Sequence, residues 1–98
     1  MNLAYTDRIT VDTSGVLITR GETAGSGVIP NDIEIRAIAI KPETSTDVYW
    51  IKGTHADANW VKESSVFSLE GLASDSWNMF YVKSNSGSIV MNLHVKGR

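Results

Sequence analysis

The sequence contains no cysteine, two prolines and no long hydrophobic run. The absence of cysteine excludes disulfide bonds and cysteine-based metal sites. No apolar segment approaches the roughly 20 residues needed to cross a bilayer. The first residues also lack a basic region followed by an apolar one, so we expect neither a membrane partner nor a secretory signal. Nine Lys and Arg against eleven Asp and Glu give a net charge of −2, which disfavours nucleic acid as a partner.

What the sequence does have is a two-residue alternation of apolar and polar side chains, with no helical periodicity. About seven such segments follow one another at intervals of roughly 8–15 residues, separated by glycine-, serine- and asparagine-containing turns. This spacing predicts an all-β protein, a small antiparallel β-sandwich. A jelly-roll path and an immunoglobulin-like path are both compatible with it.

The alternation is clearest in the last predicted strand. It places four residues on the inner face (Ile89, Met91, Leu93 and Val95) and three on the outer face (Asn92, His94 and Lys96). Two turns are predicted to close hairpins. The residues Thr13-Ser14-Gly15 separate strands at 8–12 and 16–19, and the segment 84–87 precedes the last strand.

The longest predicted strand, 32–41, changes character halfway. Ile33, Ile35, Ala37 and Ala39 share one face, whereas Ile38 and Ile40 make the opposite face apolar. A strand of this kind passes between two sheets, carries a β-bulge, or meets a partner chain. Under the last interpretation, Ile38 and Ile40 form part of an interface.

Residues 1–7 have no clear period and are predicted to form an N-terminal arm ahead of a single domain at 8–98. Frayed termini explain such a segment, but the arm also contains Leu3 and Tyr5, which could lie on a neighbouring subunit because aromatic anchors favour interfaces.

Residues for chemistry are sparse. His55 lies in a polar loop beside Asp57, and His94 lies on an outer strand face, so neither has the three or four converging ligands that a metal needs. No serine stands in a Gly-x-Ser-x-Gly elbow. We therefore expect no enzyme activity, no metal and no cofactor.

The aromatic residues are concentrated in the second half of the chain. Tyr49 and Trp50 must face opposite sides of one strand, as must Phe80 and Tyr81, so one member of each pair is predicted to be in the core. Trp60 follows the loop that carries His55 and is predicted to be an exposed anchor. The candidate interface residues are therefore Leu3, Tyr5, Ile38, Ile40 and Trp60.

The order of segments resembles a family of short virion proteins of tailed bacteriophages. In that family an Ile-Thr-Val strand with a glycine turn is followed by a loop, a long strand, a Val-Tyr-hydrophobic-x-Gly strand, a Ser-Leu segment and a strand with a Tyr-Val pair. The matching segments here are 9–15, 33–40, 46–53, 67–70 and 80–82. The chain departs from the family at Trp60, where small polar residues are usual, and in its longer last strand, 88–95.

The resemblance implies a structural protein of the virion, synthesised in the host cytoplasm and placed on the capsid surface. It implies a cement or decoration protein that binds the major capsid protein by non-covalent contacts, as a homo-oligomer with a trimer as the favoured form. The alternative is a carbohydrate- or receptor-binding module of a tail or fibre, with Trp60 and either Trp77 or Tyr49 as glycan platforms.

Overall fold

The computed structural model describes residues 3–21, 27–72 and 78–98. This part of the chain is all-β and contains eight strands and no helix. It therefore contains no helix that is long and apolar enough to cross a membrane. The strands are β1 (Leu3–Val11), β2 (Val16–Thr19), β3 (Ile35–Pro42), β4 (Tyr49–Lys52), β5 (Val61–Glu63), β6 (Phe67–Leu69), β7 (Asn78–Ser84) and β8 (Ile89–Gly97).

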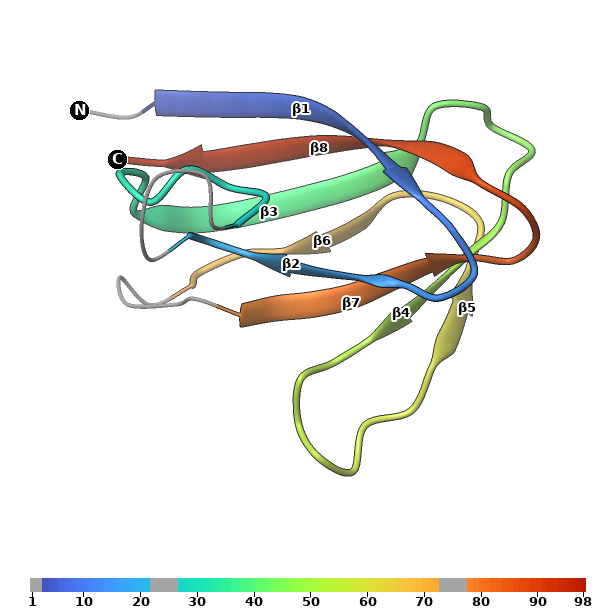
Figure 1. The fold of residues 1–98 in the computed structure, drawn as a ribbon. Helices are drawn as coiled ribbons and strands as arrows, with labels where there is room; N and C mark the ends of the chain where they lie inside the picture. Colours follow the sequence, from blue (N-terminus) through green and yellow to red (C-terminus); the bar gives the residue numbers. More distant parts are fainter. Residues whose placement is uncertain (1–2, 22–26, 73–77) are drawn as a thin grey trace.

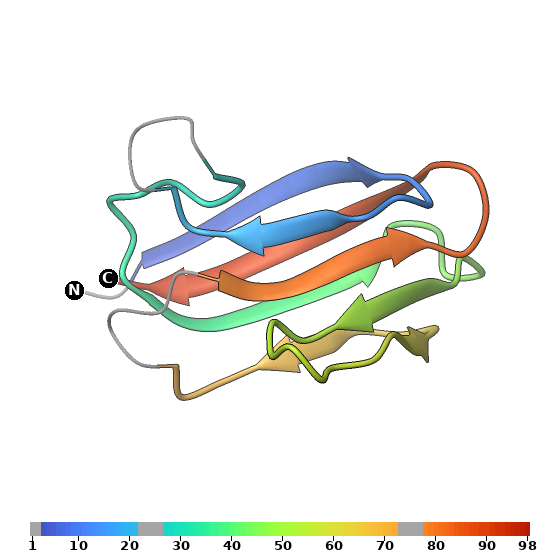
Figure 2. The same ribbon diagram turned by 60° about the horizontal axis from the view of Figure 1, so that its bottom comes forward.

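The strands form two four-stranded sheets, with the orders β1-β8-β3-β6 and β2-β7-β4-β5. All pairings within the sheets are antiparallel. Figures 1 and 2 show the two layers packed face to face. This pair of strand orders is that of the eight-stranded jelly roll. The predicted β-sandwich is confirmed, and the strand order decides between the two paths that the sequence left open.

Neither predicted hairpin forms. β1 pairs with β8 in one sheet, while β2 pairs with β7 in the other. The turns at 12–15 and 84–87 therefore carry the chain from one sheet to the other, instead of folding a strand onto its neighbour. Gly15 and Gly87 have φ angles of 97° and 61°, so both turns use the left-handed conformation that glycine adopts at low cost.

A bulge explains the mixed pattern of β3. The register with β8 shifts between Ile35 and Ala37, so that Ile35 faces the core before the shift and Ile38 and Ile40 face it afterwards. Ile38 is 2% exposed and Ile40 is fully buried. The prediction that these two residues belong to an interface is wrong, because the extra residue of the bulge turns their side chains inward.

The predicted N-terminal arm is also different in the structure. From Leu3 onward it is part of β1, which pairs with β8 along its whole length, from Leu3 opposite Gly97 to Val11 opposite Ile89. Asp7 faces the inner side of this edge strand, and its carboxylate accepts a hydrogen bond from the backbone N–H of Arg8 at 2.9 Å. A charged residue in this position makes an edge strand a poorer template for further strands.

The core lies between the sheets and consists of isoleucine, valine, leucine, methionine and two aromatic residues. Phe80 packs edge-on against Phe67, with ring centroids 5.0 Å apart. The predicted opposite facing of neighbouring aromatics is confirmed: Tyr49 and Phe80 are buried, whereas Trp50 is half-buried and Tyr81 is exposed. The inner and outer faces of β8 are likewise as predicted.

Among the residues that the structure describes, Tyr49 is the largest fully buried side chain, and its hydroxyl donates a hydrogen bond to the carbonyl oxygen of Ser65. Burial raises the pKa of Tyr49 to about 12, and the carboxylate of Glu63 adds to this shift. The phenol is therefore held in its neutral form. Because Tyr49 is buried, it cannot serve as the glycan platform that the sequence suggested.

The ends of β8 and β3 approach very closely. A Cβ atom at Gly97 would overlap the backbone carbonyl oxygen of Glu34, just before β3. Arg98 and Glu34 exchange two backbone hydrogen bonds there, of 3.0 and 2.9 Å. The approach requires a residue without a side chain at position 97.

Candidate binding surfaces

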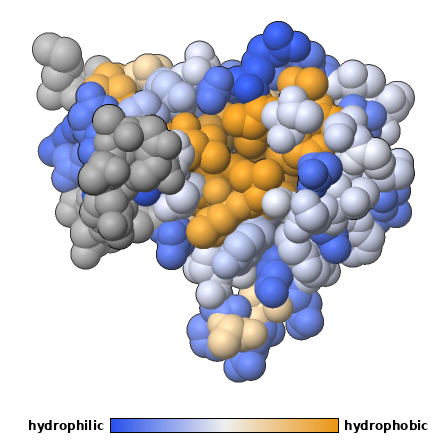
Figure 3. Space-filling model, viewed as in Figure 1, coloured by the Kyte–Doolittle hydropathy of each residue, from blue (hydrophilic) through white to orange (hydrophobic). Residues whose placement is uncertain are grey.

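One side of the sandwich exposes hydrophobic side chains along the edge where β1 and β2 lie. We call this surface the edge strip, and it is formed by Leu3, Tyr5, Ile9, Val16 and Val28. Leu3 is 38% exposed, and the other four are half-buried and pack against the core. Figure 3, in the view of Figure 1, shows hydrophobic side chains gathered over β2 and the region between β2 and β1.

Polar contacts fix the position of the edge strip. The Tyr5 hydroxyl lies 3.3 Å from the Asp7 carboxylate and 3.5 Å from the carbonyl oxygen of Val28, which ties β1 to the segment that precedes β3. Burial raises the pKa of Tyr5 above its usual value, and the neighbouring Asp7 carboxylate raises it further. Two of the predicted interface residues, Leu3 and Tyr5, therefore lie together on this surface.

The outer face of the β2-β7-β4-β5 sheet carries a cluster of a different kind. We call it the aromatic–lysine face, and it is formed by Trp50, Lys52, Trp60, Lys62, Tyr81 and Lys83. The strand register places Trp50 opposite Lys83 on β7 and Lys62 on β5, and Lys52 opposite Tyr81. Aromatic and lysine side chains thus alternate both along the strands and across them.

The distances show that each ammonium group lies near a ring. Lys83 Nζ is 4.3 Å from the centroid of Trp60 and 5.9 Å from that of Trp50. Lys52 Nζ is 6.0 Å from the Trp60 centroid and 5.8 Å from that of Tyr81. Lys62 Nζ is 5.9 Å from the Trp50 centroid. These distances lie within the range of cation–π attraction.

The rings themselves are anchored. Trp50 donates its indole N–H to Asn85 Oδ1 at 3.1 Å. Trp60 lies edge-on to Tyr81, with centroids 6.4 Å apart and ring planes at 63°, and it covers Gly15. Trp60, the predicted exposed anchor, is half-buried within this cluster. Trp77 lies outside the described residues.

Sequence reasoning missed the lysines of this surface. The signal is a tripeptide that occurs three times, in which an aromatic residue and a lysine flank one aliphatic residue: 50–52, 60–62 and 81–83. In a strand the first and third residues share a face, so each tripeptide places a ring and an ammonium group side by side. Because the net charge is a sum over the whole chain, it does not reveal the local excess of positive charge on this face.

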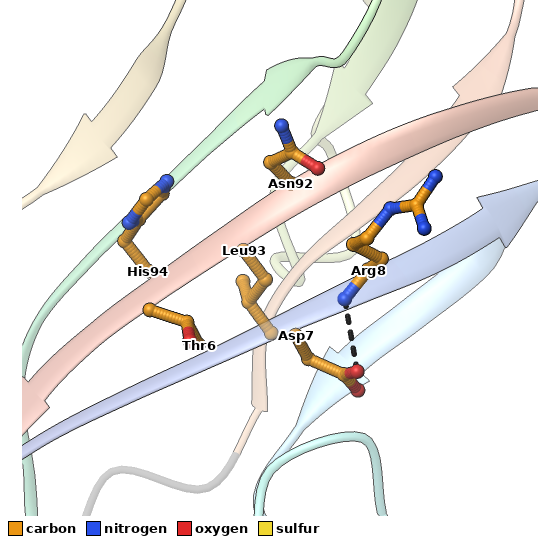
Figure 4. Close-up of a pocket in the computed structure, with 6 residues that line it drawn as sticks. All are labelled: Thr6, Asp7, Arg8, Asn92, Leu93 and His94. Atoms are coloured by element: carbon orange, nitrogen blue, oxygen red, sulfur yellow. Dashed lines mark hydrogen bonds between the residues drawn. The ribbon is translucent and has the colours of Figure 1, made fainter.

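A third surface is a shallow polar groove of about 400 Å³ on the outside of the other sheet, between β1 and β8 (Figure 4). Thr6, Arg8, Asn92 and His94 line it. The Arg8 guanidinium is paired with Glu43, with Nε 2.7 Å from the carboxylate. The side-chain oxygen of Asn92 is buried and accepts no hydrogen bond within the described residues.

The histidines remain apart. Nδ1 of His55 accepts the backbone N–H of Asp57 at 3.1 Å, a contact that shapes the loop before β5. His94 is exposed on the outer face of β8. Over residues 3–21, 27–72 and 78–98, no three histidine or carboxylate side chains come close enough together to hold a metal ion.

Comparison with known proteins identifies no family. No family model matches the chain, and no curated protein matches its sequence. Among solved structures, the crystal structure of PirA is similar over 93% of each chain, with a TM-score of 0.49 and 11% sequence identity. A likeness this distant assigns no function.

Proposed function

We propose that this protein is a structural component of a bacteriophage virion, a cement or decoration protein that docks on the outer shell by non-covalent contacts. The observation that carries the proposal is the edge strip. Partly exposed hydrophobic side chains gathered along one side of a small β-sandwich are typical of a protein–protein contact surface. The resemblance to short virion proteins supports the same assignment, and jelly rolls recur in viral capsid domains, although fold likeness is only an analogy.

The geometry of the edge strip suits a contact that is made many times. Its apolar side chains can be removed from water on docking, and Asp7, which shares a face of β1 with Tyr5 and Ile9, adds a charged group to the same surface. On a symmetric shell, each copy adds to the total binding free energy, so modest single contacts suffice. A homo-oligomer, with a trimer as the favoured form, would use the same edge at a symmetry axis.

The location is tested by mass spectrometry of purified particles of the phage whose genome encodes the chain. The docking surface is tested by adding the purified protein to particles that lack it and measuring bound protein by sedimentation. Ile9→Lys and Leu3→Glu place charges in the edge strip and should weaken binding by at least about tenfold. Leu3 is sufficiently exposed that its substitution leaves the fold intact, which unfolding curves verify.

Val66→Lys is the matched control. Val66 is 55% exposed and lies between β5 and β6, on the opposite edge of the sandwich. This variant should bind particles as the wild type does. Absence of the chain from purified particles would refute the virion assignment. Presence in particles, with equal binding of all three variants, would refute the edge strip as the docking surface.

A further inference from the structure

We propose that the aromatic–lysine face is a binding site for an acidic polysaccharide. The inference concerns a different surface from the edge strip, and it holds whether the protein sits on a capsid or elsewhere. It rests on the arrangement of Trp50, Trp60 and Tyr81 with three lysines on the outer face of the β2-β7-β4-β5 sheet.

The first argument is charge. Three of the nine basic side chains of the sequence gather on this face. Among the other described residues, six basic side chains are outnumbered by nine acidic ones. Within the described part of the chain, no carboxylate lies within 4.0 Å of Lys52, Lys62 or Lys83, whereas Arg8 and Arg36 both form ion pairs. A positive face on a negative protein attracts anions, and its lysines have N–H donors left for a ligand.

The second argument is that these lysines are held in place. An isolated exposed lysine loses side-chain entropy when it binds an anion. Here the rings position the ammonium groups in advance, most closely at Lys83, 4.3 Å from the Trp60 centroid. Pre-organisation of this kind lowers the cost of binding. A row of fixed cations over three strands suits a ligand with repeated negative charges.

The third argument distinguishes a saccharide from a nucleic acid. A base stacks on an open aromatic face. The ring of Trp60 is already approached by two ammonium groups, and it meets Tyr81 at 63° instead of lying parallel to it. Two successive bases therefore find no parallel pair of platforms. The hydroxyl and carboxylate groups of a sugar chain can bind the lysines, while its C–H groups contact the ring edges.

The test measures binding of polygalacturonate and hyaluronate to the intact protein, by calorimetry at low and at physiological salt, with dextran as the neutral polymer and oligo(dT) as the nucleic acid. We expect both acidic polysaccharides to bind, with affinity that falls as salt rises, and dextran not to bind. Each of the substitutions Lys52→Gln, Lys62→Gln and Lys83→Gln should weaken binding about twofold to fivefold.

Trp60→Ala should weaken binding between about twofold and tenfold, because it removes the ring that positions two of the lysines. The matched control is Lys96→Gln, which removes an exposed lysine from the opposite sheet and should bind as the wild type does. Unfolding curves of each variant show whether it keeps the fold, and the lysine variants test the site even if Trp60→Ala is unstable.

Three results would overturn the proposal. The first is that neither acidic polysaccharide binds. The second is that Lys96→Gln weakens binding as much as Lys83→Gln does, since the attraction would then belong to no particular face. The third is that oligo(dT) binds more tightly than both polysaccharides, which would make the surface a nucleic-acid site. The particle-binding assay with Ile9→Lys is unaffected by each of these outcomes, so the two proposals can fail separately.

Discussion

Leu93 offers the most direct test of the sandwich. It is fully buried at the middle of β8, where its Cα lies opposite Asp7 on β1 and Ile40 on β3. Leu93→Ala removes three carbon atoms, which at about 0.8 kcal/mol each gives about 2.4 kcal/mol, and the cavity left behind adds to this. We expect a loss of about 3 kcal/mol in the free energy of unfolding. With an m-value of about 1.5 kcal/mol per M, the urea midpoint falls by about 2 M.

The neighbouring residue supplies the control. His94 lies on the opposite side of the same strand and is exposed, so His94→Ala should change the free energy of unfolding by less than about 0.5 kcal/mol. Leu93→Asp should leave the protein unfolded, because a buried unpaired charge costs several kcal/mol against a total stability of about 5–15 kcal/mol. Equal urea midpoints for Leu93→Ala and His94→Ala would refute the register of β8.

Three further outcomes are expected. Gly97→Ala should lower the melting temperature strongly, because the new Cβ overlaps backbone before β3, whereas Gly53→Ala meets one atom at ordinary contact distance and should be nearly neutral. The folded-state pKa of Tyr49 is about 12, above its ordinary value, so the contribution of the neutral phenol to stability is lost as pH rises from about 10 through 12. The difference in the free energy of unfolding between the wild type and Tyr49→Phe should therefore shrink over that interval. A difference that stays constant with pH in urea titrations would contradict this. Asp7→Val frees a backbone N–H on the β1 edge and should increase aggregation in light scattering, whereas Arg8→Gln keeps that hydrogen bond and should assemble as the wild type does.

The alternation in β8 could be predicted from the sequence because it depends on one local rule, that successive side chains of a strand point to opposite faces. The same rule predicts the wrong face for Ile38, because the bulge near Arg36 is set by the packing of β3 against β8 and has no local signature in the sequence. The turn glycines were recognisable by their residue type. Whether a turn connects two strands of the same sheet or of different sheets depends instead on pairing between distant strands. For this reason local sequence predicts hairpins at two turns that in fact connect the two sheets.

The candidate sites divide in the same way. Trp60 could be named as a candidate from its place after a polar loop, although the structure shows it half-buried, and the three aromatic-x-lysine tripeptides are visible in the sequence. Their meeting on one face required the register of β4 with β5 and β7, which period-two patterning does not specify. The edge strip required the knowledge that β1 and β2 are both edge strands, although Leu3 and Tyr5 were already candidates.

The pairing of β1 with β8 has a consequence for how the protein is made. Within the described sheets, β1 pairs with β8, from Leu3 opposite Gly97 to Val11 opposite Ile89, and β2 pairs with β7, so both strands are synthesised long before their partners. The β2-β7-β4-β5 sheet cannot form completely before β7 is synthesised, and the β1-β8-β3-β6 sheet cannot form before β8, so the nascent chain holds unpaired apolar strands until then. We therefore expect slow folding dominated by distant contacts, and a dependence of soluble yield on temperature and on chaperones during expression.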